Sequence, residues 1–305
     1  MPSPAPLHPL TFSLFRIADP FVPTAAGLGP VPHWTTGYGS QKTSLLARFR
    51  AERWSKAKRP FAARWRQSTR VMVYPGEEIS RCIYLEGIYE PHQMLYLDGV
   101  LKRGMVFADI GANCGLYSLV AASRVGPRGS VIAVEPSGRE FGRLEQNLAL
   151  NGAKNVRAYR LALGQKEDTA DLRIASLPHT GHNTLSKNFA YADTRLETVE
   201  RIRMTTLDRL LEAEKIDRLD VLKLDTEGSE LGILKGSERT LRAHHPVILI
   251  EILPPNLDAE AEELWGFIRS LGYRLMAYAP ESGVPFAADR HPGAPHTDFI
   301  AVPGA

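Results

Sequence analysis

The stretch VFADIGANCGLYSL, residues 106–119, decides the fold class of this chain. It begins with apolar and small residues that are typical of a buried strand, and Asp109 stands near the end of that strand. A turn with two glycines, Gly111 and Gly115, follows, and an apolar run with helical spacing begins after it. The two glycines predict that a ligand approaches the bare backbone where the strand ends.

The composition limits the classes of partner and the cellular location that we expect. The chain has 305 residues, 44% of them hydrophobic, with a formal net charge of +3 at pH 7 and a pI near 8.8. This weak positive charge permits an acidic partner without requiring one. Cys82 and Cys114 are too few for a disulfide framework, and the N-terminus, MPSPAPLHPL, lacks the pattern of a secretory signal. No apolar run approaches the roughly 20 residues of a membrane span. We therefore expect a cytoplasmic protein without a membrane span.

The first seventy residues differ from the rest of the chain. Residues 1–40 are rich in proline and glycine, which predicts a tail that is disordered or draped over the body. Residues 43–70 are basic and have helical spacing, and Pro60 is expected to divide them into two short helices. This extension is either a solvated appendage packed by its aromatic side chains or a surface that attracts an anionic substrate or nucleic acid. We therefore separate residues 1–70 from a domain at 71–305.

From residue 71 onward, short apolar runs alternate with helical patterns of ten to fifteen residues. Strands are expected at 71–74, 81–86, 105–110, 130–135, 156–163, 220–225, 246–252, 272–279 and 297–303. Helices are expected at 91–104, 113–126, 137–152, 229–244 and 261–272. An antiparallel pair at 169–174 and 201–206, with a loop at 176–194, interrupts this order. The alternation predicts an α/β fold with a doubly wound, mostly parallel sheet, which binds ligands at the carboxyl ends of its strands.

The turn after the first buried strand distinguishes a dinucleotide cofactor from S-adenosylmethionine. A dinucleotide site needs a third glycine, but Tyr117 and Ser118 stand where it would fall. Asp109 would also repel a diphosphate, whereas it would attract the positive amino and sulfonium groups of S-adenosylmethionine. Glu135, at the end of the next strand, is placed to hold a ribose diol, which both cofactors carry. The adenine is expected near the backbone of Ala162.

Six segments together resemble the FkbM-type methyltransferases, and the resemblance runs from about residue 84 to the final TDFIAVP. These segments are DIGANCGLYSL, VIAVEPSGREFGRLEQNLALNG, RLALG, MTTLDRLL, VLKLDTEGSELGILKGSERTL and PVILIEI. The resemblance implies a class I, Rossmann-like fold, S-adenosylmethionine as cofactor, and methyl transfer to a hydroxyl oxygen of a small molecule, sugar or natural-product intermediate. It also implies a set of cofactor-binding residues: Asp109, Gly111, Asn113, Gly115 and Glu135. Glu90 would lie near the methionine end of the cofactor, and Asp225 and Glu227 beside the reaction centre.

An alcohol is a poor nucleophile at neutral pH, so methyl transfer to oxygen benefits from a base or a divalent metal ion. Asp225 and Glu227 could serve as a base or as metal ligands, and their alternative role is to cap the following helix. His182 and Glu251 are candidate partners, Glu251 for a metal in particular. The histidines of the loop at 176–194 could equally be solvated side chains.

Asp225-Thr226-Glu227-Gly228 departs from the signature of amino-methylating nucleic-acid enzymes, an Asn or Asp followed by Pro-Pro and an aromatic residue. The sequence therefore favours an O-methyltransferase with a small or carbohydrate-like acceptor. An RNA methyltransferase that uses the basic extension is the first alternative. A cofactor-binding protein without turnover and a Rossmann oxidoreductase are the others.

Overall fold

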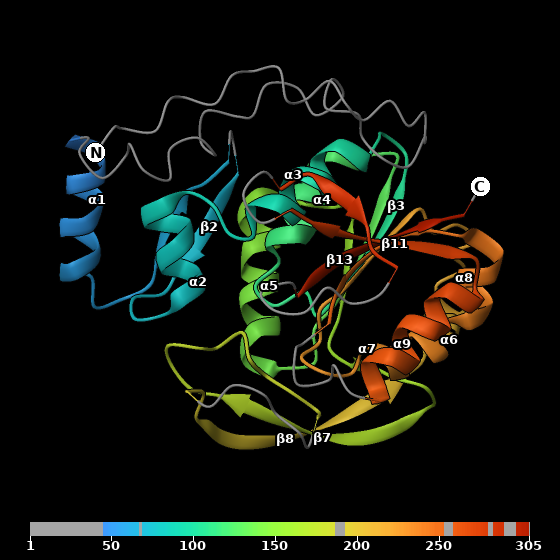
Figure 1. The fold of residues 1–305 in the computed structure, drawn as a ribbon. Coiled ribbons are helices and arrows are strands. Elements are labelled where there is room, and N and C mark those ends of the chain that lie inside the picture. The colour runs from blue at the N-terminus through green and yellow to red at the C-terminus, as the bar shows by residue number, and fades with distance from the viewer. Residues whose placement is uncertain are drawn as a thin grey trace, which may run out of the picture.

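The protein is described by a computed structural model, which covers residues 45–66, 69–186, 193–252, 259–279, 283–289 and 297–304. The predicted tail at 1–40 lies outside these residues. The main sheet has eight strands in the order β12-β11-β13-β10-β9-β3-β4-β5 (Figure 1). In that order, the strands are Pro285–Ala287, Tyr273–Tyr278, Asp298–Pro303, Val247–Glu251, Val221–Leu224, Val106–Ile110, Ser130–Val134 and Val156–Tyr159.

The sheet is doubly wound about β3, as predicted. β3 pairs in parallel with both β4 and β9, and the parallel pairing continues to β5 on one side and β10 on the other. β13 lies between β10 and β11 and is antiparallel to both. Because the central strands are parallel, their carboxyl ends meet at one edge of the sheet, where ligands bind in folds of this kind.

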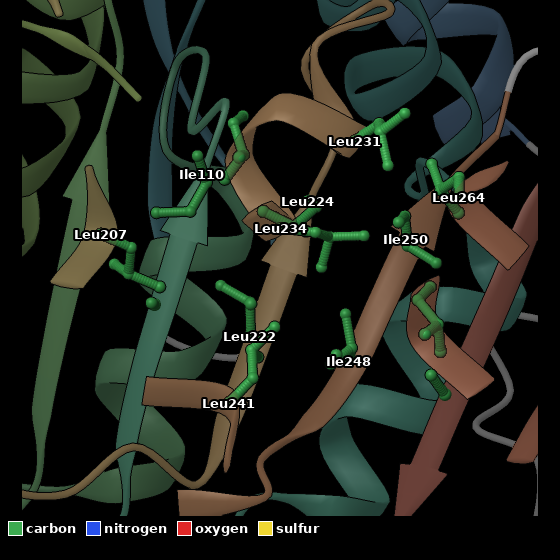
Figure 2. Close-up of a cluster of buried hydrophobic side chains, with 14 of the residues drawn as sticks. Ile110, Leu207, Leu222, Leu224, Leu231, Leu234, Leu241, Ile248, Ile250 and Leu264 are labelled. Atoms are coloured by element: carbon green, nitrogen blue, oxygen red, sulfur yellow. The ribbon is translucent and has the colours of Figure 1, made fainter. Parts of the chain in front are cut away.

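Helices cover both faces of the main sheet (Figure 1). One face carries α3 (Pro91–Val100), α4 (Leu116–Val125) and α5 (Gly138–Asn151), and the other carries α6 (Leu207–Ala213), α7 (Glu230–Lys235), α8 (Glu238–His244) and α9 (Ala259–Ser270). Figure 2 shows how the second face is filled: Leu222, Leu224, Ile248 and Ile250 project from the strands toward leucines of these helices. The predicted helix at 229–244 is thus two helices, α7 and α8. In the part of the chain that the structure describes, no helix is both long and apolar enough to cross a membrane.

The N-terminal part of the described chain corrects two predictions. Helix α1 (Leu45–Lys56) ends before Pro60, but residues 61–64 form strand β1, which pairs with β2 (Arg70–Val73) instead of forming a second helix. This hairpin spans residue 70, where the sequence places its domain boundary; that division stays a prediction. Residues 81–86, predicted as a strand, are helical: α2 (Glu78–Arg81) runs into a π-helix, η4 (Cys82–Glu86). Ile79 and Ile83 are both buried, and their separation of four residues is helical spacing.

A smaller sheet follows β5 and lies below the main sheet in Figure 1. It has the order β6-β8-β7, with β6 at Ala162–Leu163, β7 at Asp168–Ala175 and β8 at Leu196–Thr205. β7 and β8 are antiparallel, which confirms the predicted inserted pair. The predicted strand at 156–163 is divided, because β6 leaves the main sheet and pairs with β8.

Candidate functional site

A cavity of about 340 Å³ opens at the carboxyl ends of the parallel strands. Its floor includes Ile110 and Val134, the last residues of β3 and β4. The loop after β7 and the start of η4 also line the cavity, with His182 and Cys82 among their residues. The volume falls within the roughly 300–1,000 Å³ of small-molecule pockets.

The glycines of the turn have a packing role that the sequence did not predict. Gly111 has φ 79°, and a Cβ there would lie 1.7 Å from the carbonyl oxygen of Asp225. Gly115 has φ 86°, and a Cβ there would lie 2.5 Å from Cδ1 of Leu144 on α5. Both glycines therefore allow protein to pack closely against protein. Gly111 does line the cavity, but Gly115 is not among the lining residues.

Glu135 fixes the shape of this turn. Its Oε2 accepts a hydrogen bond from the backbone N–H of Asn113 at 2.8 Å, and its Oε1 accepts one from the N–H of Ser137 at 2.9 Å. Glu135 is 5% exposed, and burial together with the charge of Glu140 raises its pKa to about 8. Each carboxylate oxygen accepts up to two hydrogen bonds, so both can still receive a ligand hydroxyl.

Ala162, near which the sequence predicts the adenine, lines the cavity together with Leu161 and Leu163; the adenine position stays a prediction. Asp109 does not line the cavity. Its side chain is fully buried under α4, where the Ser118 hydroxyl donates to Oδ2 at 2.6 Å. Its strand neighbour is Lys223, so the Asp109 carboxyl lies close to the site although it does not line the cavity. Its predicted contact with the cofactor stays a prediction.

Lys223 is the functional residue that the sequence analysis missed. Its Nζ donates to Oδ2 of Asp225 at 2.8 Å and lies 4.5 Å from the ring centroid of Tyr117. Burial alone would raise the pKa of Asp225, but the Lys223 ammonium outweighs it and holds that pKa below its usual value. The lysine interrupts the buried strand VLKL, and a charge in such a strand was the signal that could have identified it.

Glu90 lies beside this pair, at the entrance to α3. It has the left-handed φ of 45°, and the hydroxyl of Tyr117 donates to its Oε2 at 2.5 Å. Burial and the nearby charge of Asp225 raise the pKa of Glu90 to about 7, against the opposing effect of Lys223. A strained residue at a cavity wall is often retained for a functional reason.

Glu227 and Glu251 complete the acidic end of the cavity. Burial and the charge of Asp225 raise the pKa of Glu227 to about 9 and hold that of Glu251 well above its usual value. The capping alternative is not realised by Asp225 or Glu227. Instead, Glu230 accepts hydrogen bonds from the N–H groups of Thr226 and Gly228 at the start of α7.

His182 lies in the wall, stacked on His179 with ring centroids 5.2 Å apart. Its Nδ1 is 2.7 Å from the hydroxyl oxygen of Thr194, and burial with the neighbouring His179 lowers its pKa, so it is neutral at pH 7. His179 in turn lies 3.0 Å from a carboxylate oxygen of Glu78 on α2. The histidine loop is therefore tied to the N-terminal helices and is not simply solvated.

Two cysteines also line the cavity, Cys82 and Cys114. Burial raises the pKa of both thiols, which keeps them protonated at neutral pH. Neither is therefore placed as a nucleophile.

The strand order and the cavity at the carboxyl ends of β3, β4 and β9 define a class I, Rossmann-like α/β fold. Residues 109–275 match the methyltransferase FkbM domain, and the chain belongs to this family. The resemblance of the sequence to FkbM-type methyltransferases is thereby confirmed.

Individual relatives are distant. The chain is 26% identical over 202 residues to the AMB antimetabolite synthetase AmbE of Pseudomonas aeruginosa, a match that covers 53% of this chain and 9% of that protein. It is 25% identical over 182 residues to the hexuronic acid methyltransferase AglP of Haloferax volcanii, covering 60% of this chain and 70% of AglP. A crystal structure of an FkbM methyltransferase from Methylobacillus flagellatus superposes with a TM-score of 0.43 at 17% identity, covering 65% of this chain and 43% of that one.

Proposed function

We propose that the chain transfers a methyl group from S-adenosylmethionine to a hydroxyl oxygen of a small, sugar-like acceptor. One observation carries this proposal: a single cavity joins the turn held by Glu135 to the acidic cluster around Asp225. A nucleoside cofactor and an acceptor hydroxyl can therefore meet in one cavity, as in-line methyl transfer requires.

The residues present fit S-adenosylmethionine. Glu135 would hold the ribose diol, and the backbone of Asn113 and the wall at Ala162 would flank the nucleoside. Glu90 would lie at the methionine end, where its carboxylate attracts a positive amino group. When bound, this cofactor supplies a methyl carbon activated by a sulfonium.

Asp225 is the group that we assign to the acceptor. Lys223 holds it as a carboxylate at neutral pH, so it can orient the hydroxyl and take its proton as the bond from oxygen to methyl carbon forms. The methyl carbon would come from the sulfonium of the bound cofactor, whose sulfur would be released as a neutral thioether. Glu227 and His182 line the same space and would orient the acceptor.

The charges of the cavity bear on the class of acceptor. Lys223 is the lysine among the lining residues that the structure describes, and no arginine is among them. Its ammonium is already paired with Asp225, so the described wall offers no unpaired ammonium or guanidinium to an anionic group. The part of the acceptor that enters is therefore expected to be neutral. AglP acts, by its name, on a hexuronic acid; a carboxylated sugar would find no such partner among these lining residues.

The basic extension gives less support to an RNA acceptor. The guanidinium of Arg53 lies 4.2 Å from the ring centroid of Phe61, and that of Arg50 lies 5.9 Å from the ring of Tyr84. These arginines pack on the aromatic side chains of the hairpin and η4, which favours an appendage over an open anion-binding surface.

The test is methyl transfer itself. The purified chain is supplied with methyl-labelled S-adenosylmethionine and a panel of neutral sugars, uronic acids, small alcohols and RNA. We expect labelled product from a neutral hydroxylated acceptor, and a loss of turnover by about 10²-fold in Asp225→Asn. Glu263→Gln, which alters an exposed ion pair with Lys235, is the matched control. Label incorporated into RNA alone would contradict the proposed acceptor class.

A further inference from the structure

Three carboxylates meet at the carboxyl edge of the main sheet. Leu224, the last residue of β9, pairs with Ile250 of β10, so the next residues, Asp225 and Glu251, lie side by side. Glu227 lies on the turn that follows β9. One oxygen from each of the three carboxylates lies within 4.8 Å of the others. They belong to the wall of the cavity described above.

Two of these acids have a buried oxygen that nothing in the described chain satisfies. Oε2 of Glu227 and Oε2 of Glu251 are buried and have no hydrogen-bond partner among the described residues. Glu227 as a whole is only 9% exposed. Buried polar atoms of folded proteins almost always have a partner, so these two oxygens indicate a ligand that binds between them.

The charges indicate what kind of ligand. The Lys223 ammonium binds Oδ2 of Asp225, which leaves the other oxygen of that carboxylate available. Three carboxylates with one ammonium leave an excess of two negative charges when all are ionised. Like charges this close are costly unless a cation compensates them. A divalent cation would balance the cluster.

We propose that Asp225, Glu227 and Glu251 bind a hard divalent cation of the Mg²⁺, Mn²⁺ and Ca²⁺ class in this cavity. Carboxylate oxygens are the ligands that these ions prefer. Two oxygens bound to one such ion lie between about 3 Å (neighbouring ligands) and about 5 Å (opposite ligands) apart. The three oxygens lie within 4.8 Å of one another, so small movements of the side chains bring them to a common ion. The cation site stands on these contacts alone. Its role, to bind the acceptor hydroxyl and ease the loss of its proton, rests on the proposed function.

The competing occupant is a proton. The carboxyl groups of Asp225 and Glu251 lie close enough to share one, which would relieve part of the repulsion. Protons on these acids, including one on Glu227 itself, relieve the repulsion but give Oε2 of Glu227 no partner, whereas a cation satisfies all three acids. The two occupants are distinguished by direct metal binding.

The experiment titrates Mn²⁺ alone into the full chain, without cofactor or acceptor, and follows the free ion by electron paramagnetic resonance. We expect one Mn²⁺ per chain, displaced by Mg²⁺ or Ca²⁺, and weakening of about tenfold or more in Glu227→Gln and in Glu251→Gln. Glu263→Gln should bind as the unaltered chain does. Thermal unfolding of each variant establishes that it folds, and Glu227→Gln, on a turn, is the variant that least disturbs the sheet.

Absence of binding at millimolar Mn²⁺, or equal affinity in both variants and the control, would overturn the proposal. Binding of S-adenosylhomocysteine is measured separately, so that a failure of the cation site can be distinguished from a failure of the proposed function. Binding of the nucleoside without any binding of Mn²⁺ would refute the cation site and leave the proposed function standing. Methylation of an acceptor in the presence of a chelator would refute the role of the cation. Binding of Mn²⁺ at these acids without binding of the nucleoside would refute the proposed function and leave the cation site standing.

Discussion

Glu135 allows the proposed cofactor site to be tested through pH. Its pKa of about 8 in the ligand-free chain comes from burial and from Glu140, and the N–H groups of Ser137 and Asn113 oppose it. At pH 6 only about 1% of this carboxyl would be ionised, and at pH 7 about 10%. A ribose diol donates two hydrogen bonds to the ionised form. Binding is therefore expected to strengthen by about tenfold per pH unit between 6 and 8 and to level off above.

The assay is isothermal titration with 5′-methylthioadenosine, which has the ribose diol but lacks the amino and carboxyl groups of the full cofactor. Those groups titrate in the same range or would face Glu90, whose pKa is about 7, so this ligand isolates Glu135. In Glu135→Gln the dependence on pH should disappear between 6 and 8. In Glu135→Ala affinity at pH 8 should fall at least tenfold, since each charge-assisted hydrogen bond contributes roughly 1.5–3 kcal/mol. The same slope in the unaltered chain and in Glu135→Gln would refute the assignment.

Four further predictions concern the pH dependence of stability, the packing at Gly111, turnover and RNA binding. Folding raises the pKa of Glu135, so the stability that this carboxyl contributes is full below pH 4.5 and is lost as pH rises through 8. The thermal unfolding temperature of the ligand-free chain should therefore depend less on pH in Glu135→Gln than in the unaltered chain. Gly111→Ala places a Cβ 1.7 Å from a carbonyl oxygen and should lower the free energy of unfolding in urea by roughly 3 kcal/mol or more. The control, Gly142→Ala, places a Cβ that meets nothing within 4 Å and should be neutral or stabilising. Asp225→Asn should lower kcat by about 10²-fold and change cofactor affinity less, and equal losses in both would reassign it to cofactor binding. RNA should bind weakly to the basic residues of 48–56, and tight binding that falls steeply with salt would favour the RNA alternative.

The doubly wound, mostly parallel form of the main sheet was predictable because parallel βαβ units carry a strong sequence signal. VFADI and VILIE are apolar apart from Asp109 and Glu251, as expected of strands that helices cover on both faces. The N-terminal helices were less predictable. Residues 81–86 contain β-branched and aromatic residues, and their helical form depends on burial of Ile83 and Tyr84 against the body of the protein.

The residues of the site likewise differ in how far the sequence could predict them. Glu135, Asp225 and Glu251 could be placed because they stand at strand ends, which share one edge of the sheet. The partnership of Lys223 with Asp225 depends on which face of β9 each side chain occupies and on the desolvation that burial brings. The close approaches at Gly111 and Gly115 are contacts between distant segments, so the sequence showed the need for glycine but not its cause.

The central claim is that this cavity binds S-adenosylmethionine for methyl transfer, and the most direct test is calorimetric titration of the purified chain with S-adenosylmethionine and, separately, with NAD. The account predicts saturable binding of one S-adenosylmethionine per chain, strongly weakened in Glu135→Ala, and no binding of NAD. Saturable binding of NAD without binding of S-adenosylmethionine would contradict it.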